Sequence, residues 1–92
     1  MAEILSNDRL MEQLLQILDN GDPRDRLYVY RVRDGKPIKP AVLKCTPFPD
    51  LFEHLRDELG GGAFKLLIRR SDQMILAGTI SIASPLERRL RG

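Results

Sequence analysis

The chain has one cysteine, one histidine and no tryptophan, and aromatic residues make up only 5% of it. With Cys45 alone, an internal disulfide and a cysteine-rich zinc site are excluded, and a reducing compartment is indicated. With His54 alone, a metal site would need carboxylates only, so we expect no metal and no cofactor. No apolar run reaches membrane-spanning length, and the N-terminus lacks the basic start and apolar stretch of a secretory signal. We therefore expect a soluble, cytoplasmic protein with no membrane partner.

The acidic and basic residues fall into alternating blocks, although the net charge is only +2. Six acids and two arginines occur in residues 1–25, and six basic residues and one acid in residues 26–48. Four acids and one arginine follow in residues 49–59, and six basic residues and two acids in residues 60–92. The blocks predict an acidic helical part and a basic strand part. Separated charge of this kind steers association with a partner.

A chain of 92 residues, 42% of them hydrophobic, can form one small core. We expect a single domain over residues 1–92, with its core over residues 6–83 and a basic tail over residues 84–92.

The first predicted element is a helix that begins near Ser6, a suitable N-cap, and ends at Asn20-Gly21. Its apolar side chains recur at spacings of three and four residues, which places them on one helix face. This face carries more apolar surface than one side of a small sheet readily covers. We predict that it forms a protein interface, and packing on the domain's own sheet is the alternative. The predicted interface residues are Leu10, Met11, Leu14, Ile17 and Leu18.

Four strands and a second helix follow. Alternation predicts a strand over residues 27–33 with one solvent-exposed face, in which Tyr28, Tyr30 and Val32 point one way and Val29, Arg31 and Arg33 point the other. The Asp34-Gly35 turn leads to an edge strand over residues 41–45, because Pro37 and Pro40 weaken pairing before it. The second helix opens at residues 48–50 and ends at three glycines, residues 60–62, of which at least one should have a positive φ. Two further strands lie on either side of a turn near residues 71–73.

This order predicts an α+β fold of the form α-ββ-α-ββ, with a four-stranded, mainly antiparallel sheet and two helices. The second helix should cover one face, and its core residues should be Phe52, Leu55, Phe64, Leu66, Ile68 and Ile80. We expect the first helix to cover part of the other face; if it does not, the apolar floor there is an interface. That floor would consist of Val29, Val42, Leu67, Ile75 and Ala77. Gly78 indicates a bulge or the close approach of a helix.

No enzyme chemistry is indicated. Glu53, Asp57 and Glu58 lie on one predicted helix, but no nucleophile or second base accompanies them. The triple glycine leaves a helix and enters a strand, whereas a phosphate loop joins a strand to a helix N-terminus. We therefore predict no catalytic residues.

Nucleic-acid binding is a serious candidate, because the basic residues lie on strands that should come together. Tyr28 or Tyr30 would offer a stacking platform if its face is open, although both suit a core equally well. Basic outer strands also protect a sheet against aggregation, and no helix-turn-helix or zinc-finger pattern is present. The candidate nucleic-acid contacts are Arg31, Arg33, Lys44, Lys65, Arg69 and Arg70.

Residues 50–82 read as an amphipathic helix ending in Gly-Gly-Gly, then Ala-Phe-Lys-Leu-Leu-Ile-Arg-Arg, a polar turn and Ile-Leu-Ala-Gly-Thr-Ile-Ser-Ile. This pattern resembles small helix-and-hairpin domains encoded by phages and mobile elements. The resemblance implies a virion or accessory protein rather than an enzyme, and it transfers no catalytic residue. We therefore expect a structural or assembly protein that associates with itself, as a homo-oligomer, or with a larger protein assembly, in the cytoplasm or in a virion. A nucleic-acid-binding accessory protein is the alternative.

Overall fold

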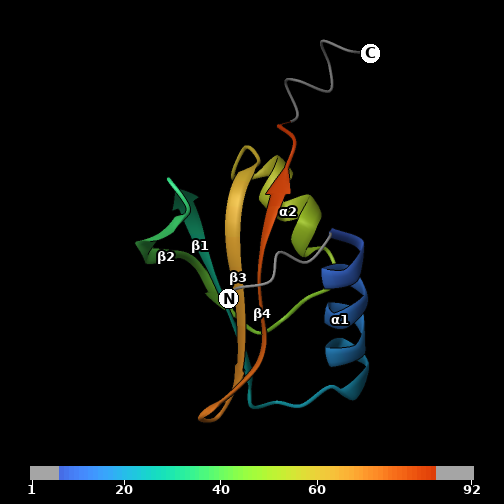
Figure 1. The fold of residues 1–92 in the computed structure, drawn as a ribbon. Helices are drawn as coiled ribbons and strands as arrows, with labels where there is room; N and C mark the ends of the chain where they lie inside the picture. Colours follow the sequence, from blue (N-terminus) through green and yellow to red (C-terminus); the bar gives the residue numbers. More distant parts are fainter. Residues whose placement is uncertain (1–6, 85–92) are drawn as a thin grey trace.

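The computed structural model describes residues 7–84, which form two helices and a four-stranded antiparallel sheet (Figure 1). The sheet has the strand order β2-β1-β3-β4. The predicted α+β class and the α-ββ-α-ββ order are confirmed. Ser6 and residues 85–92 of the predicted basic tail lie outside the described residues. The elements are α1 (Asn7–Asn20), β1 (Asp25–Arg33), β2 (Lys36–Cys45), α2 (Leu51–Asp57), β3 (Gly62–Arg70) and β4 (Gln73–Ile82).

Both helices pack on the same face of the sheet, where their buried leucines join those of the strands. Gly78 of β4 lets α1 approach closely, because a Cβ atom there would lie 2.8 Å from Leu10 Cδ2. The expectation that α1 covers the opposite face is therefore wrong, and the predicted close approach at Gly78 is confirmed. The buried core consists of Leu10, Leu14, Leu27, Val29, Leu51, Leu55, Phe64, Leu66, Ile68, Leu76 and Ile80.

The predicted core is largely confirmed. Of its six members, only Phe52 is partly exposed, and it packs against the buried cluster. The triple glycine also behaves as predicted, with φ values of 77°, 73° and 115° at Gly60, Gly61 and Gly62. The Gly61 amide donates a hydrogen bond of 2.9 Å to the Leu55 carbonyl, which closes the end of α2.

The helices cover the side of β1 that carries Leu27 and Val29. Val29 is fully buried, and it pairs with Leu66 of β3 in the same row of the sheet. Tyr28, Tyr30 and Val32 therefore point to the side without helices. The reason is that β1 lies between β2 and β3, so its apolar residues on the helix side complete the core.

Only some residues of the predicted apolar floor lie on the side of the sheet without helices. Leu67 and Ala77 are paired on the side without helices, but Val29 is in the core. Ile75 has no partner in β3, because the register shifts between the Ile68–Leu76 and Arg69–Met74 pairs, and its side chain packs against the core. Val42 remains 40% exposed.

β2 is an edge strand, as predicted, but it is longer than expected and begins at Lys36. Its two halves pair with β1 on either side of a register shift between Val29 and Arg31. Pro37, one of the two prolines expected to weaken pairing, is the partner of Val32 in the ladder. This is possible because an edge strand can direct the side that lacks an amide proton towards solvent.

Candidate functional site

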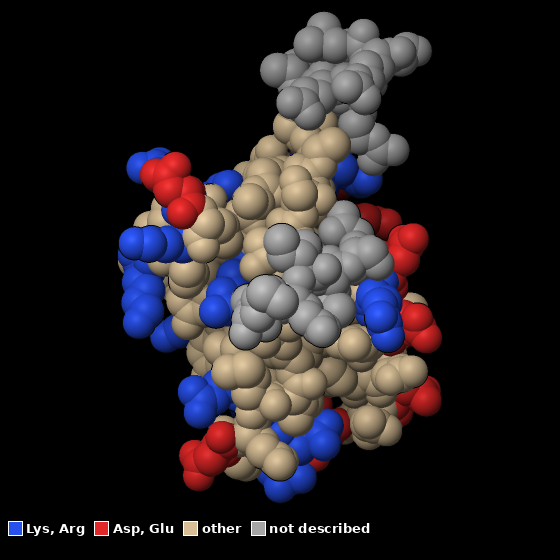
Figure 2. All heavy atoms as spheres, in the orientation of Figure 1, with Lys and Arg blue, Asp and Glu red and all other residues tan. Residues whose placement is uncertain are grey.

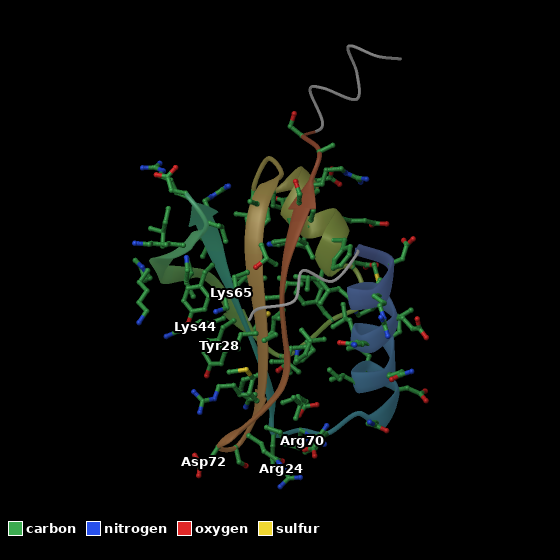
Figure 3. The ribbon with its side chains drawn as sticks, viewed as in Figure 1. Arg24, Tyr28, Lys44, Lys65, Arg70 and Asp72 are labelled. Atoms are coloured by element: carbon green, nitrogen blue, oxygen red, sulfur yellow. The ribbon has the colours of Figure 1, made fainter. Side chains whose placement is uncertain are left out.

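One side of the sheet carries no helix, and we call it the helix-free face. Strand register assigns it residues from all four strands, since side chains alternate along each strand and pair in rows across the sheet. Lys44, Lys65 and Tyr28 are seen on the side away from α1 (Figure 3). The helix-free face consists of Arg26, Tyr28, Tyr30, Val32, Pro37, Lys44, Ala63, Lys65, Leu67, Arg69, Met74, Ala77, Thr79 and Ser81.

The two tyrosines lie in neighbouring rows at the centre of this face. Tyr28 has Lys44 on one side and Leu67 on the other, and Tyr30 is the partner of Lys65. Both tyrosines are half-buried, so part of each side chain is accessible to solvent. Residues two apart in a strand are about 6.8 Å apart, which leaves each ring a separate contact area. Each aromatic ring therefore lies directly beside a lysine.

The helix-free face is basic. Arg26 and Arg69 are partners across β1 and β3 and are exposed, as is Lys44, while Lys65 is half-buried. The four strands, all of which are described, contain a single acid, Asp25, and it lies on the helix side. Figure 2 shows most Lys and Arg atoms over the β1–β2 side of the molecule and most Asp and Glu atoms over the helices. The expected separation of basic strands from acidic helices is therefore present in three dimensions.

Two hollows mark this side of the sheet. The first, of about 350 Å³, has Lys65 among apolar walls and is lined by Val32, Gly35, Pro37, Lys65, Ala77, Gly78 and Thr79. The second, of about 410 Å³, is lined by Arg26, Leu27, Tyr28, Lys44, Cys45 and Thr46. Both volumes lie in the range of about 300–1,000 Å³ that is typical of small-molecule sites. Each hollow combines at least one basic side chain with apolar surface.

The six basic residues predicted to contact nucleic acid do not form one surface. Lys44, Lys65 and Arg69 lie on the helix-free face, whereas Arg31, Arg33 and Arg70 alternate to the other side. Sequence reasoning missed Arg26, because the strand was expected to begin at residue 27. Extending the alternation of Tyr28 and Tyr30 one step towards the N-terminus would have found it.

Arg31 is bound within the domain. Its guanidinium donates hydrogen bonds to the Leu59 carbonyl and, at 3.3 Å, to the Gly61 carbonyl. The same group lies 5.1 Å from the centre of the Phe64 ring, a distance that suits a cation–π contact. Arg31 therefore ties the glycine loop after α2 to the sheet, and its charge is directed away from the helix-free face.

Arg70 is also bound, at the end of the sheet where α1 leads into β1. Its guanidinium donates two hydrogen bonds, of 2.7 and 3.1 Å, to Asp25, which is only 2% exposed. Its Nε atom lies 3.0 Å from the carboxylate of Asp22. A hydrogen bond from the Arg24 side chain, together with one from the Arg24 amide, holds the pKa of Asp22 well below its usual range.

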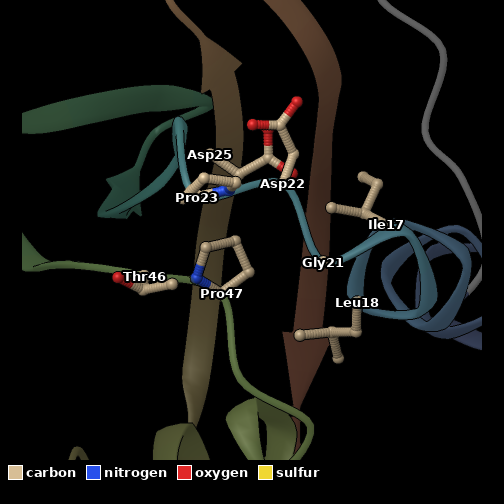
Figure 4. A pocket seen from close by; sticks show the side chains of 8 residues that line it. All are labelled: Ile17, Leu18, Gly21, Asp22, Pro23, Asp25, Thr46 and Pro47. Carbon is tan, nitrogen blue, oxygen red and sulfur yellow. The ribbon is translucent and has the colours of Figure 1, made fainter.

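A third hollow, of about 240 Å³, lies beside these carboxylates (Figure 4). It is lined by Ile17, Leu18, Gly21, Asp22, Pro23, Asp25, Thr46 and Pro47. Asp22 and Asp25 are both paired with arginine, which provides hydrogen-bond donors for their carboxylate oxygens. We interpret this cluster as a structural anchor that joins the α1–β1 connection to the end of β3.

The predicted interface residues of α1 are divided between the core and the surface. Leu10 and Leu14 are buried in the domain's own core, so they are not accessible to another chain in the folded domain. Met11, Ile17 and Leu18 are half-buried against that core. Leu15, which belongs to the same predicted apolar stripe, is 50% exposed. The prediction that α1 contacts a partner therefore depends on Leu15 and on the exposed parts of its neighbours.

The sequence also singled out two isolated side chains, His54 and Cys45. The ring of His54 meets that of Phe48 edge to face, with the centroids 5.8 Å apart. Partial burial raises the pKa of the Cys45 thiol. Within residues 7–84, no three His, Cys, Asp or Glu side chains gather where they would hold a metal ion. Neither described helix has the length and apolar character needed to cross a membrane.

Comparison of the chain with protein-family models, with curated proteins and with solved structures found no match. The resemblance of residues 50–82 to small phage domains stays a prediction. The functional proposals below rest on the geometry of the helix-free face and of the sheet edges.

Proposed function

We propose that the protein is a small, non-enzymatic module that binds nucleic acid on its helix-free face. The observation that carries the proposal is the placement of two tyrosines and four basic residues on one face that has no acid and no covering helix. Those residues are Arg26, Tyr28, Tyr30, Lys44, Lys65 and Arg69.

The basic side chains supply the attraction to phosphate. Phosphate contacts provide most of the affinity of a sequence-independent nucleic-acid binder, and they make it depend strongly on salt. Asp34 and Asp72 lie in the two hairpin turns and not on the paired strands, so no acid stands between the basic residues. The charged side chains that a phosphate chain would meet on this face are all basic.

The tyrosines supply the contact to bases. Stacking of a base on an aromatic ring is worth about 1–3 kcal/mol and tolerates any base sequence. Single strands expose their bases for such stacking, whereas duplexes keep them paired. Because Tyr28 and Tyr30 each adjoin a lysine, a base on the ring and its phosphate on the ammonium can be bound together. We therefore propose single-stranded DNA or RNA as the ligand.

Removing Lys44 and Lys65 should weaken this binding and reduce its salt dependence. For single strands, the slope of log affinity against log salt is about −0.7 for each phosphate neutralised, so Lys44→Gln with Lys65→Gln should make the slope shallower by about 1.4. The matched control is Arg33→Gln with Lys36→Gln, a pair that removes the same charge on the other side of the β1–β2 hairpin. Fluorescence anisotropy of a labelled single strand, measured at several salt concentrations, gives both slopes. Equal losses in the two variants would show that total charge acts and the face does not.

Assembly is the second candidate, and one observation favours it. The acids of α1 and α2 lie on the opposite side of the sheet from the basic face (Figure 2). Copies of the chain could therefore associate head to tail, with acidic helices on a basic sheet, as a small virion or accessory protein would require. The mass in solution, measured with and without nucleic acid, distinguishes the candidates. A discrete oligomer that ignores nucleic acid favours assembly, and a shift on adding a single strand favours binding.

A further inference from the structure

The two edges of the sheet differ in their chemistry. β2 carries two prolines and three lysines, and these residues prevent an edge from pairing with another chain. β4, at the opposite edge, is ten residues long and reads Gln-Met-Ile-Leu-Ala-Gly-Thr-Ile-Ser-Ile, with no proline and no charged residue. One edge is therefore protected against pairing and the other is not.

The outer edge of β4 is open in the described part of the chain. β4 pairs with β3 from the Arg70–Gln73 pair to the Gly62–Ile82 pair, with Ile75 alone left unpaired at the register shift. Within residues 7–84, no strand lies on its other side. Alternate backbone amides and carbonyls of an edge strand point outwards, which makes it a template for a further strand. An uncharged edge of this length is a docking element in a native protein or else an aggregation hazard.

Apolar surface continues from this edge onto the helix layer. α1 packs mainly against β4, with Leu10 over Gly78, and it lies on the β4 side of the molecule (Figure 1). Leu15 of α1, in the helix layer, is 50% exposed, and Met74 of β4, on the helix-free face, is 59% exposed. The β4 edge thus offers backbone hydrogen-bonding groups, with one exposed apolar side chain on each side of the sheet.

We propose that β4 pairs in antiparallel fashion with β4 of a second copy of this chain. The occupant is a second copy because an uncharged strand meets no like charge in its own copy, and because an antiparallel pair of identical strands closes with two-fold symmetry. The two sheets would join into one of eight strands, with both helix layers on the same side. The α1 helices then lie on either side of the symmetry axis. Because a stable interface typically buries roughly 800 Å² per partner, the helix layers should contribute to the contact together with the paired edges.

The proposed dimer has a consequence for the helix-free face. A two-fold axis perpendicular to the sheet keeps the helix-free faces of both copies on one side, so the basic and aromatic rows form a single surface of twice the width. A strand of nucleic acid could contact both copies, and the second contact would benefit from a high effective concentration. This consequence rests on the proposed function, whereas the dimer itself does not.

The test places a charge on the β4 edge. Ala77 is exposed on the helix-free face and lies near the middle of β4, so Ala77→Lys places a lysine of each copy close to the symmetry axis. Sedimentation velocity of the parent should give twice the mass of the chain, and the Ala77→Lys variant should give the mass of one chain with an unchanged circular dichroism spectrum. The matched control is Val42→Lys on the protected edge, which should remain dimeric. In the parent, amide exchange of β4 should slow as concentration rises.

Three outcomes would overturn the proposal. A parent that stays monomeric at several hundred micromolar has no such interface. A dimer that survives Ala77→Lys but dissociates on Leu15→Asp associates through α1 alone. A mass that grows without limit at low salt indicates head-to-tail association of acidic helices with basic sheets. Failure of the proposed function would instead appear as a dimer that binds no single strand, so the two failures are distinguishable.

Discussion

Replacing Phe64 with alanine should lower the free energy of unfolding by about 3–5 kcal/mol, the range measured when large aromatic side chains are removed from a core. Phe64 is fully buried in β3, where it is the partner of Ile80 and the ring beneath the Arg31 guanidinium. The change leaves a cavity, and it also removes the aromatic contact of a cation that ties down the glycine loop. Since small domains are stable by about 5–15 kcal/mol, this is a large part of the total.

Urea denaturation measures this loss, and Phe52→Ala is the matched control. Phe52 belongs to α2 and contacts the same core, but it is only half-buried, so the same chemical change should cost less. An unfolding midpoint of Phe64→Ala equal to that of the parent would contradict the burial of this side chain.

The second large effect is expected at Gly61. All three glycines after α2 have positive φ, a region that costs a residue with a Cβ atom about 1–2 kcal/mol. At Gly61 a Cβ atom would also lie 2.7 Å from the Ile82 carbonyl oxygen and 2.9 Å from that of Ala83. Both contacts are with backbone, which cannot move aside as a side chain would. Gly61→Ala should therefore separate the end of β4 from the loop or force the loop to rearrange.

Gly60→Ala is the control for this change. Gly60 has a φ of 77°, close to the 73° of Gly61, but a Cβ atom there would meet nothing within 4 Å. Gly60→Ala should lower the free energy of unfolding only by the cost of a positive φ for a residue with a Cβ atom. Gly61→Ala should lower it by at least twice as much. Thermal unfolding of the two variants under identical conditions makes the comparison. Equal melting temperatures would indicate that the loop does not approach the end of β4.

The periodicities of the chain predicted the elements and their order, but they did not predict which face of the sheet is covered. Alternation in β1 separates Tyr28 and Tyr30 from Val29 and Arg31, and either set is compatible with a core. The deciding feature is the apolar rows that form only when β1 lies beside β3, with Leu27 next to Ile68 and Val29 next to Leu66. That pairing depends on strand order, which the sequence left open.

The candidate site shows the same limitation. Lys44, Lys65 and Arg69 were predicted from local alternation, and the structure places them on one face. Arg31 is also a basic residue on a strand of the sheet, but its guanidinium donates hydrogen bonds to the Leu59 and Gly61 carbonyls. This contact joins residues about thirty positions apart, so no local pattern reveals it. In α1, likewise, a stripe of leucines identifies a buried face without showing whether the domain or a partner buries it.

The most direct test of the account is to follow backbone amide resonances while a short single strand of DNA or RNA is added. The account predicts that the largest shifts fall on β1 and β3, at Arg26, Tyr28, Tyr30, Lys65 and Arg69, and that residues of α2 on the opposite side change little. Shifts that cluster on the helices, or the absence of any change at low salt, would contradict binding on the helix-free face.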